Sequence, residues 1–402
     1  MSSETATSES TGELIRAAET AIAGVPLRLQ RLLIAYFLLV IGIVPLAQVY
    51  AELRTGESVQ VFDVFRQVPT VEALTAYERQ LEKRSVVAAP VRRFLQWLGL
   101  VTLRTGNQKA LVGPTGVLFY KPSLEAAVRP GFMAAPQAQG HPLPAIVAWH
   151  EALAAAGVKL VVLACPGKEA IYPEWLDPGY DLSRGPAVNP DLDHFVATLR
   201  QRGVTVIEPT DLLWSQKHQG ELYLHQDTHW SPLGMRLVAD EVARHVPRPI
   251  GRRQEFALQE AEVVAYGDLY EMLQLPDLPT PLLPQRVRIE RVVHVASGDP
   301  VEPDDGAPVV LLGDSFTNIY SVPEMGWGDH AGLGEQLAYR LGCRLDIVAM
   351  NDGGVNRARV AFARRGDPLR GKRVVIWQFA ARDLVVSNGD WETIAIGRKS
   401  KE

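Results

Sequence analysis

The chain has 402 residues, of which 47% are hydrophobic and 22% charged, and its formal net charge is −5. This is an ordinary globular composition, long enough for two or three domains, and it excludes a whole-protein basic field that would attract nucleic acid. Two cysteines, Cys165 and Cys343, are too few for a disulfide framework and have no neighbouring thiol or histidine for a zinc site. We expect both to be small buried residues.

The N-terminal region contains one long apolar segment. Residues 32–51, LLIAYFLLVIGIVPLAQVYA, carry no charge and are long enough to cross a bilayer as a single helix. Arg28 and Arg31 precede the segment, whereas Arg54 is the nearest cation after it. This excess of positive charge before the segment predicts that residues 1–31 are a cytoplasmic tail and that the rest of the chain is exported.

Two other interpretations of this segment stay open. Val-Tyr-Ala before Glu52 has the small-residue pattern of a signal-peptidase site, so cleavage near Ala51 would release the protein. A buried core helix is the second alternative. The long leader favours a retained, single-pass transmembrane anchor.

The pattern of apolar residues in the rest of the chain changes near residue 110. Residues 52–109 have apolar positions at helical spacing, which predicts a helical stalk or cap. From 110 to 390, runs rich in Val, Ile and Leu alternate with amphipathic helices, which predicts an α/β domain whose parallel sheet is covered by helices on both faces. The runs are 158–166, 204–209, 308–315, 344–352 and 372–380, the helices are 191–203, 231–246, 330–341 and 355–364, and 250–305 is less regular.

Ligands of such sheets bind at the carboxyl ends of the strands, so functional side chains are expected at that edge. The run 308–315 ends in Gly313-Asp314-Ser315, where a helix is expected to begin. Free backbone N–H groups at the start of a helix would point toward a group bound to this serine. Ser315 is therefore a candidate nucleophile. The same placement is typical of a plain helix N-cap, and this alternative stays open.

A nucleophilic serine needs a base that is held by a carboxylate. In the segment 221–235, ELYLHQDTHWSPLGM, Asp227 and His229 stand just before Ser231-Pro232, which are typical of a helix N-cap and first helical residue. Asp227 can hold the imidazole Nδ1–H and leave Nε2 to take the serine proton. The alternatives are a structural Asp–His hydrogen bond and a metal site at His225 and His229, for which no third ligand is evident.

The order of these motifs resembles a known family. Asp227-Thr228-His229-Trp230 followed by Gly313-Asp314-Ser315-Phe316 is similar to the SGNH-hydrolase-like O-acetyltransferases of bacterial exopolysaccharide assembly, the alginate O-acetyltransferase AlgJ/AlgX type. Ordinary SGNH esterases carry Gly-Asp-Ser near the N-terminus and the Asp and His near the C-terminus, so the order here is the permuted one. Further similar segments, within a resemblance extending from about 62 to 384, are VGPTGVLFYKPSL at 112–124, CPGKEAIYPEWL at 165–176 and YGDLYEML at 266–273.

The resemblance implies an SGNH-like catalytic domain at 110–390, with a triad of Ser315, His229 and Asp227. We expect no metal and no cofactor. The resemblance implies transfer of acetyl groups through an acetyl-serine to hydroxyls of an exported polysaccharide, alginate or another exopolysaccharide. It also implies a bacterial inner membrane with the catalytic domain in the periplasm, and a membrane O-acyltransferase partner as acetyl donor. A periplasmic carbohydrate esterase and a non-catalytic polysaccharide-binding scaffold are the alternatives.

The sequence departs from the family in its oxyanion donors, because the usual asparagine block has no plain counterpart after Ser315. The backbone N–H groups of Ser315, Gly353 and Gly354 are the candidates, and a simple turn is the alternative for the glycine pair. Lys168 and Arg382 stand at strand ends and are candidates for binding a carboxylate on the polymer. A structural ion pair is the alternative for each of them.

Overall fold

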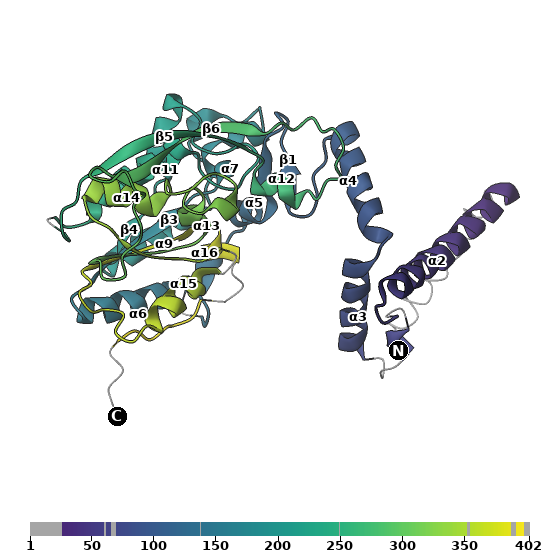
Figure 1. Cartoon of the computed structure of the whole chain (residues 1–402), viewed down its shortest axis with the longest axis horizontal. Coiled ribbons are helices and arrows are strands. Elements are labelled where there is room, and N and C mark those ends of the chain that lie inside the picture. Colours follow the sequence, from purple (N-terminus) through teal and green to yellow (C-terminus); the bar gives the residue numbers. More distant parts are fainter. Residues whose placement is uncertain are drawn as a thin grey trace, which may run out of the picture. The chain divides into compact units, whose positions relative to one another are not determined.

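The computed structural model describes residues 26–59, 62–65, 70–136, 138–248, 250–351, 354–386 and 391–397. They fall into two compact units whose boundary lies between Leu95 and Gln96. The first unit contains α2 (Leu27–Thr55), η1 (Asp63–Phe65), α3 (Val71–Arg84) and the beginning of α4 (Ala88–Leu103). The second unit contains the remaining elements (Figure 1).

Helix α2 contains the apolar segment that the sequence predicts to span a membrane. It has 29 residues, and its most apolar window has a mean hydropathy of 2.5. Only 6% of that window is buried, whereas the core helix of a soluble protein would be mostly covered. The helix is therefore compatible with a single-pass anchor, and the buried-core alternative is not supported. A signal sequence near the N-terminus meets the same criteria of length and hydropathy, so that alternative is still open.

The second unit is built on a five-stranded sheet in which every neighbouring pair of strands is parallel. Its strands, in the spatial order β4-β3-β9-β7-β8, are β4 (Thr205–Ile207), β3 (Lys159–Cys165), β9 (Val374–Ala380), β7 (Val309–Gly313) and β8 (Asp346–Ala349). Every residue of β7 and β9 is buried, because central parallel strands are covered on both faces. The predicted sheet is confirmed, and both cysteines are free and buried as expected.

Helices pack on both faces of this sheet. Val375, Trp377 and Phe379 of β9 pack in one hydrophobic cluster with α6 (Pro142–Ala155), α9 (Leu192–Gln201) and α15 (Gly354–Ala363). The alternate β9 residues, Val374, Ile376 and Ala380, pack in the other cluster with α11 (Pro232–His245) and α14 (Leu333–Leu341), on the opposite side of the sheet (Figure 1). Two cores therefore hold the strands from both sides, as the period of two along a strand requires.

The remaining helices of this unit are short. They are α5 (Lys121–Val128), α7 (Lys168–Ile171), α8 (Pro173–Leu176), α10 (Thr210–Gln216), α12 (Asp268–Met272), α13 (Ser315–Asn318) and α16 (Asp383–Val386), with 3-10 turns at Phe132–Ala134, Leu182–Arg184, Lys217–Gln219 and Pro323–Met325.

The stretch 250–305, which the sequence describes only as less regular, forms a long antiparallel ribbon. Strands β5 (Phe256–Ala265) and β6 (Gln285–His294) pair along their whole length. Charged residues break the apolar pattern of both strands, and few ribbon side chains, such as Ile289 and Val292, are buried. A small hairpin of β1 (Ala110–Val112) and β2 (Leu118–Tyr120) is also absent from the predicted elements.

The base of the ribbon holds the segment that precedes α11. Gln285 Oε1 accepts the backbone N–H of His225 at 2.9 Å, and Gln226 Nε2 donates to the Leu283 carbonyl at 2.8 Å. Gly267, just after β5, lies so close that a Cβ added there would be 2.3 Å from the Gln226 carbonyl oxygen. The ribbon therefore presses α12 against residues 226–228, at the carboxyl edge of the sheet.

Candidate active site

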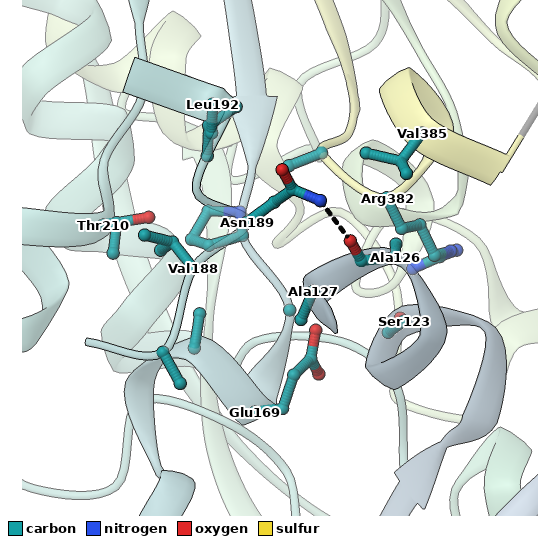
Figure 2. Close-up of a pocket in the computed structure, with 15 residues that line it drawn as sticks. Ser123, Ala126, Ala127, Glu169, Val188, Asn189, Leu192, Thr210, Arg382 and Val385 are labelled. Atoms are coloured by element: carbon teal, nitrogen blue, oxygen red, sulfur yellow. Dashed lines mark hydrogen bonds between the residues drawn. The ribbon is translucent and has the colours of Figure 1, made fainter. Parts of the chain in front are cut away.

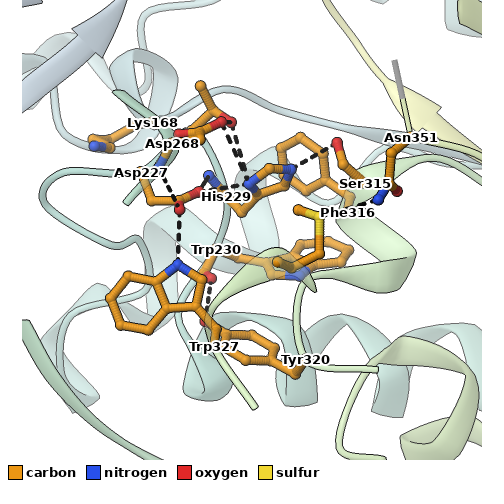
Figure 3. A network of polar contacts seen from close by, with 12 residues as sticks. Lys168, Asp227, His229, Trp230, Asp268, Ser315, Phe316, Tyr320, Trp327 and Asn351 are labelled. Atoms are coloured by element: carbon orange, nitrogen blue, oxygen red, sulfur yellow. Dashed lines mark hydrogen bonds and ion pairs between the residues drawn. The ribbon is translucent and has the colours of Figure 1, made fainter. Parts of the chain in front are cut away.

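Ser315 lies at the carboxyl end of the central strand β7, as the first residue of α13. The N-cap of this helix is Asp314, whose Oδ1 accepts the Phe316 N–H at 2.8 Å. The N-cap interpretation of Ser315 is therefore wrong, because its neighbour fills that position. The Ser315 hydroxyl instead lies 2.8 Å from Nε2 of His229 (Figure 3).

The turn that presents the serine is fixed from β9. Gln378 donates through Nε2 to Asp314 Oδ1 at 2.8 Å and accepts the Asp314 N–H at 3.0 Å, and the Ala380 N–H donates to Asp314 Oδ2 at 3.1 Å. A Cβ at Gly313 would lie 2.1 Å from Thr317 Oγ1 and 2.9 Å from Gln378 Oε1. A residue with a Cβ before Asp314 would therefore have to displace the side chains of Thr317 and Gln378.

His229 and Asp227 come from the segment before α11, where Ser231 is the N-cap and Pro232 the first helical residue, as predicted. Asp227 Oδ1 lies 2.5 Å from His229 Nδ1 and also accepts the His229 backbone N–H at 3.0 Å. The ring of Phe316 packs edge-on against the imidazole, with 4.7 Å between centroids. The structure thus brings together the three residues that the sequence singled out, from positions 86 residues apart along the chain.

Two further residues hold Asp227, and sequence reasoning did not assign a role to either. Its Oδ2 accepts the indole N–H of Trp327 at 2.8 Å and the backbone N–H of Asp268 at 3.0 Å. Asp268 belongs to the YGDLYEML segment that carries part of the family resemblance. The sequence therefore identified the segment but not the role of Asp268. Nothing in the spacing around Trp327 distinguishes it from an ordinary core tryptophan.

Burial and charge shift the pKa values of Asp227 and His229 in opposite directions. Their side chains are 1% and 2% exposed, respectively. Burial alone would raise the pKa of Asp227, but the His229 charge and the surrounding donors outweigh it and hold that pKa well below its usual range. Burial alone would lower the pKa of His229, and the Asp227 charge and hydrogen bond outweigh it, so the pKa is raised above 6.5. Asp227 is therefore a carboxylate, and His229 is a stronger base than a free imidazole.

Ser315 opens into a polar cavity of about 210 Å³. Arg382 lines it, with its guanidinium 5.1 Å above the ring of Tyr120 and 3.8 Å from an Asp383 oxygen. Gly354, one of the expected oxyanion donors, lines the same cavity and has a φ of +61°, a conformation that glycine adopts without strain. Gly353 lies outside the described residues.

Lys168 lies inside the protein and does not line this cavity. Its Nζ donates to the carbonyl oxygens of Leu118 at 2.7 Å and His225 at 2.9 Å, which ties β2 to the segment before Asp227. Burial lowers its pKa to about 7. Because Lys168 is 3% exposed and donates to backbone carbonyls, it has a structural position, which does not support its interpretation as a polymer-binding residue.

A second cavity adjoins Arg382 from the other side and is lined mostly by apolar residues, with the Glu169 carboxyl at one end (Figure 2). Its volume of about 40 Å³ is enough for about three water molecules. Burial raises the pKa of Glu169 there. A sugar ring does not fit in this space.

Asp227, His229 and Asp268 have ligand-type atoms within 4.8 Å of one another, the spacing of a small cation site. Those atoms already form hydrogen bonds with one another and with Thr228. His225, the other half of the metal pair considered from the sequence, lies 3.0 Å from Glu221. The geometry therefore favours an acid–base network over a metal centre.

Comparison with known proteins places these residues in a family. The model of the SGNH hydrolase-like domain, acetyltransferase AlgX, matches residues 111–381, which is more than half of the chain. The chain belongs to this family. The matched residues include Ser315, His229, Asp227, Asp268 and Trp327, and Arg382 lies one position beyond them.

Curated relatives agree with this assignment. The chain is 27% identical over 273 residues to the probable alginate O-acetylase AlgJ of Pseudomonas syringae pv. tomato, covering 63% of this chain and 65% of that protein. It is 28% identical over 272 residues to the AlgJ of Azotobacter vinelandii, covering 63% and 67%. The chain thus spans slightly less than two thirds of the Pseudomonas syringae protein.

Two solved structures share the fold. The O-acetyltransferase domain of Pseudomonas putida AlgJ superposes with a TM-score of 0.53 at 24% identity, covering 69% of this chain and 92% of that one. Pseudomonas aeruginosa AlgX superposes with a TM-score of 0.54 at 20% identity, covering 73% and 69%. The SGNH-like α/β fold expected from the sequence is therefore confirmed.

Proposed function

We propose that this protein transfers acetyl groups to hydroxyls of an exported polysaccharide through an acetyl ester on Ser315. One observation carries the proposal: within an acetyltransferase-family domain, Ser315 Oγ lies 2.8 Å from His229 Nε2 while Asp227 Oδ1 lies 2.5 Å from Nδ1. This is the geometry of a nucleophile, its base and the carboxylate that orients the base. The names of the AlgJ relatives support alginate as the polysaccharide.

In the first half of the reaction, His229 takes the Ser315 proton on Nε2 as Oγ attacks the acetyl carbonyl of the donor. The donor group leaves with that proton, and the acetyl group stays on the serine. In the second half, a sugar hydroxyl gives its proton to His229 and attacks the acetyl-serine. The bond to Oγ breaks, and Ser315 recovers the proton from His229.

The negative oxygen formed in each half needs N–H donors. The backbone N–H groups of Ser315, Gly353 and Gly354 are our candidates, and Gly354 shares the cavity with the serine. The side-chain amide of Asn351 is a fourth, because Asn318 in α13 donates to its Oδ1 at 2.9 Å and its Nδ2 contacts only the weak acceptor Met325 Sδ at 3.1 Å among the described residues. Because Oδ1 is held by Asn318 and Nδ2 has no strong acceptor among the described residues, the Nδ2–H group is available to an oxyanion.

The cavity beside Ser315 is where we place the acceptor sugar. Arg382 is the cation of that cavity, and its one ion pair among the described residues, to Asp383, is long at 3.8 Å. A guanidinium with free N–H groups binds a carboxylate through two parallel hydrogen bonds, so Arg382 suits a uronate in the polymer. The stacking of Arg382 on Tyr120 would hold the guanidinium in place.

Helix α2 supports a location at the membrane. As a retained anchor it would hold the catalytic unit on the periplasmic side of a bacterial inner membrane, which agrees with the Arg28 and Arg31 bias. The periplasm has no acetyl-CoA pool, so the acetyl group must be passed outward. We therefore propose a membrane O-acyltransferase as the donor partner.

The test uses the full-length chain in detergent micelles with an activated acetyl ester and an oligouronate. Acetylated sugar that depends on Ser315, and that is lost in Ser315→Ala, supports the proposal. Free acetate without acetylated sugar would identify an esterase instead, and activity unchanged in Ser315→Ala would refute the catalytic assignment. An Asp299→Asn variant, on an exposed turn outside the site, is the matched control.

A further inference from the structure

Asp268 lies behind the Asp227–His229 pair and holds the residue between its two members. Its Oδ1 accepts the backbone N–H of Thr228 at 2.7 Å, and its Oδ2 accepts the Thr228 hydroxyl at 2.6 Å (Figure 3). Its own backbone N–H donates to Asp227 Oδ2 at 3.0 Å. Both carboxylate oxygens and the backbone of one residue are therefore committed to the Asp-x-His segment.

The same carboxylate faces the imidazole. Asp268 Oδ2 lies 3.9 Å from His229 Nδ1, in addition to the closer Asp227 oxygen. An opposite charge at about 4 Å stabilises the protonated form of a base and raises its pKa by about one unit or more. Because the Asp268 side chain is 27% exposed, water reaches it, and it can exchange protons with solvent.

The Thr228 hydroxyl connects the two groups. Its oxygen lies 3.2 Å from His229 Nδ1, while its proton is donated to Asp268. A lone pair of that oxygen therefore faces Nδ1, which favours the tautomer with the proton on Nδ1. That tautomer leaves Nε2 free to accept the proton of Ser315.

We infer that ionised Asp268 is a positioning residue of the acyl transfer: through Thr228 it supports the Nδ1–H tautomer of His229 that Asp227 sets, and its charge stabilises the imidazolium that forms when Ser315 loses its proton. This inference rests on the proposed function of the triad. It adds to that function a second carboxylate behind the base.

Three charged or titratable groups face Asp268, and a fourth belongs to its helix. Asp227 and His229 face it from the segment before α11, Lys168 faces it from α7, and Glu271 belongs to its own helix. Burial and the charge of Asp227 raise the pKa of Asp268 to about 6, although His229 and Thr228 act in the opposite direction. Asp268 is therefore ionised at neutral pH.

The charge of Asp268 predicts how activity depends on pH. The base must be neutral to accept a proton, so kcat/KM falls as the pH drops through the His229 pKa, which is raised above 6.5 partly by Asp268. Removing the Asp268 charge lowers that pKa. The acidic limb of the pH–activity profile, where kcat/KM falls with falling pH, therefore moves to lower pH. Removing the charge also lowers the plateau, because the imidazolium loses a stabilising charge. A residue that only held the loop would lower the plateau and leave the limb in place.

The experiment compares Asp268→Asn with the wild type in full-length protein in micelles, measuring kcat/KM for p-nitrophenyl acetate across the acidic limb. We expect the midpoint of the limb to fall by about one pH unit and the plateau to fall about tenfold. A midpoint that stays at the wild-type pH would overturn the inference. Glu271→Gln, which removes an exposed charge from the same short helix, is the matched control and should move neither.

A direct titration keeps the test independent of activity. Histidine-labelled protein carrying Ser315→Ala, with and without Asp268→Asn, gives the His229 pKa by NMR, and we expect the second substitution to lower it by about one unit. An unchanged pKa refutes the inference. Activity that survives Ser315→Ala refutes the proposed function instead, so the two failures are distinguishable.

Discussion

The two halves of the candidate site are built in different ways. On the serine side, a buried parallel strand delivers Ser315, and one neutral amide, Gln378, fixes the turn through Asp314. On the histidine side, a segment without regular structure is held by the base of an exposed ribbon, and its charged pair is supported by a second carboxylate. The serine side depends on sheet geometry, and the histidine side depends on electrostatics.

This difference shows which perturbations each half tolerates. A strand end that is buried on both faces keeps its position when a polar neighbour is lost, because the sheet holds it. A buried acid–base pair changes its protonation when any neighbouring donor or charge is lost. Substitutions on the histidine side should therefore change pH dependence, and those on the serine side should change rate alone.

The largest effect is expected from Asp227→Asn. Trp327 and the Asp268 N–H both donate to Oδ2, so the carbonyl oxygen of the new amide will occupy that position and its NH₂ will face His229 Nδ1. This imposes the Nε2–H tautomer, which cannot take the serine proton, and kcat should fall about 10³-fold or more. Kinetics with an activated ester checks it, and a loss of only a few-fold would contradict the assigned role of Asp227.

Alanine substitutions at Gly267 and Gly313 compare how well the two halves of the site tolerate an added methyl group. A Cβ at Gly267 would lie 2.3 Å from the Gln226 carbonyl oxygen, which is backbone, whereas a Cβ at Gly313 would meet the side chains of Thr317 and Gln378. We expect Gly267→Ala to lower kcat/KM about 10²-fold, because it displaces the Asp-x-His segment, and Gly313→Ala to cost less, because the atoms that it meets belong to side chains and not to a neighbouring backbone.

The control for this pair is Gly366→Ala, where the added Cβ would meet nothing within 4 Å. It should retain wild-type kcat/KM and melting temperature. Equal losses at Gly267 and Gly313 would contradict the claimed difference between a backbone obstacle and a side-chain one.

A smaller effect is expected from Trp327→Phe, which removes one donor to Asp227 and keeps most of the ring. A hydrogen bond to a buried carboxylate contributes about 1.5–3 kcal/mol, so kcat/KM should fall about tenfold and the pKa of Asp227 should rise. Activity profiles of both proteins across the acidic limb check this. Full activity in this variant would show that the Asp268 N–H alone is enough to hold the carboxylate.

The smallest effect concerns the cavity beside Ser315. Arg382→Gln should raise KM several-fold for an oligouronate, because the variant cannot form the bidentate contact with a carboxylate that we propose for Arg382. The same oligosaccharide with its carboxyl groups reduced to alcohols is the control acceptor. An equal change of KM for both acceptors would mean that Arg382 does not recognise the carboxylate.

The sequence predicted the residues that stand at recognisable boundaries. Ser315 ends a continuous apolar run, and His229 precedes an N-cap serine and a proline, so both could be assigned without coordinates. Trp327 and Asp268 could not be assigned, because they reach Asp227 across 100 and 41 residues and resemble ordinary core and loop residues. The ribbon that positions Asp268 was missed because few of its side chains are buried, which leaves no clear apolar alternation.

The cation assignments show a second limit of sequence patterns. Lys168 and Arg382 both follow strands and were equivalent in the sequence. Only the packing separates them, since Lys168 is enclosed by backbone carbonyls and Arg382 lines the cavity beside Ser315. Which side chain at a strand end reaches the open space depends on contacts with distant segments, in this case β2 and the segment before Asp227.

The most direct test of the central claim is mass spectrometry of the full-length protein after brief exposure to an activated acetyl ester without acceptor. We predict one added acetyl group on the peptide that contains Ser315, removed when an oligosaccharide is added and absent in Ser315→Ala. An acetyl group that never appears on that peptide, or one that the substitution leaves in place, would contradict the account.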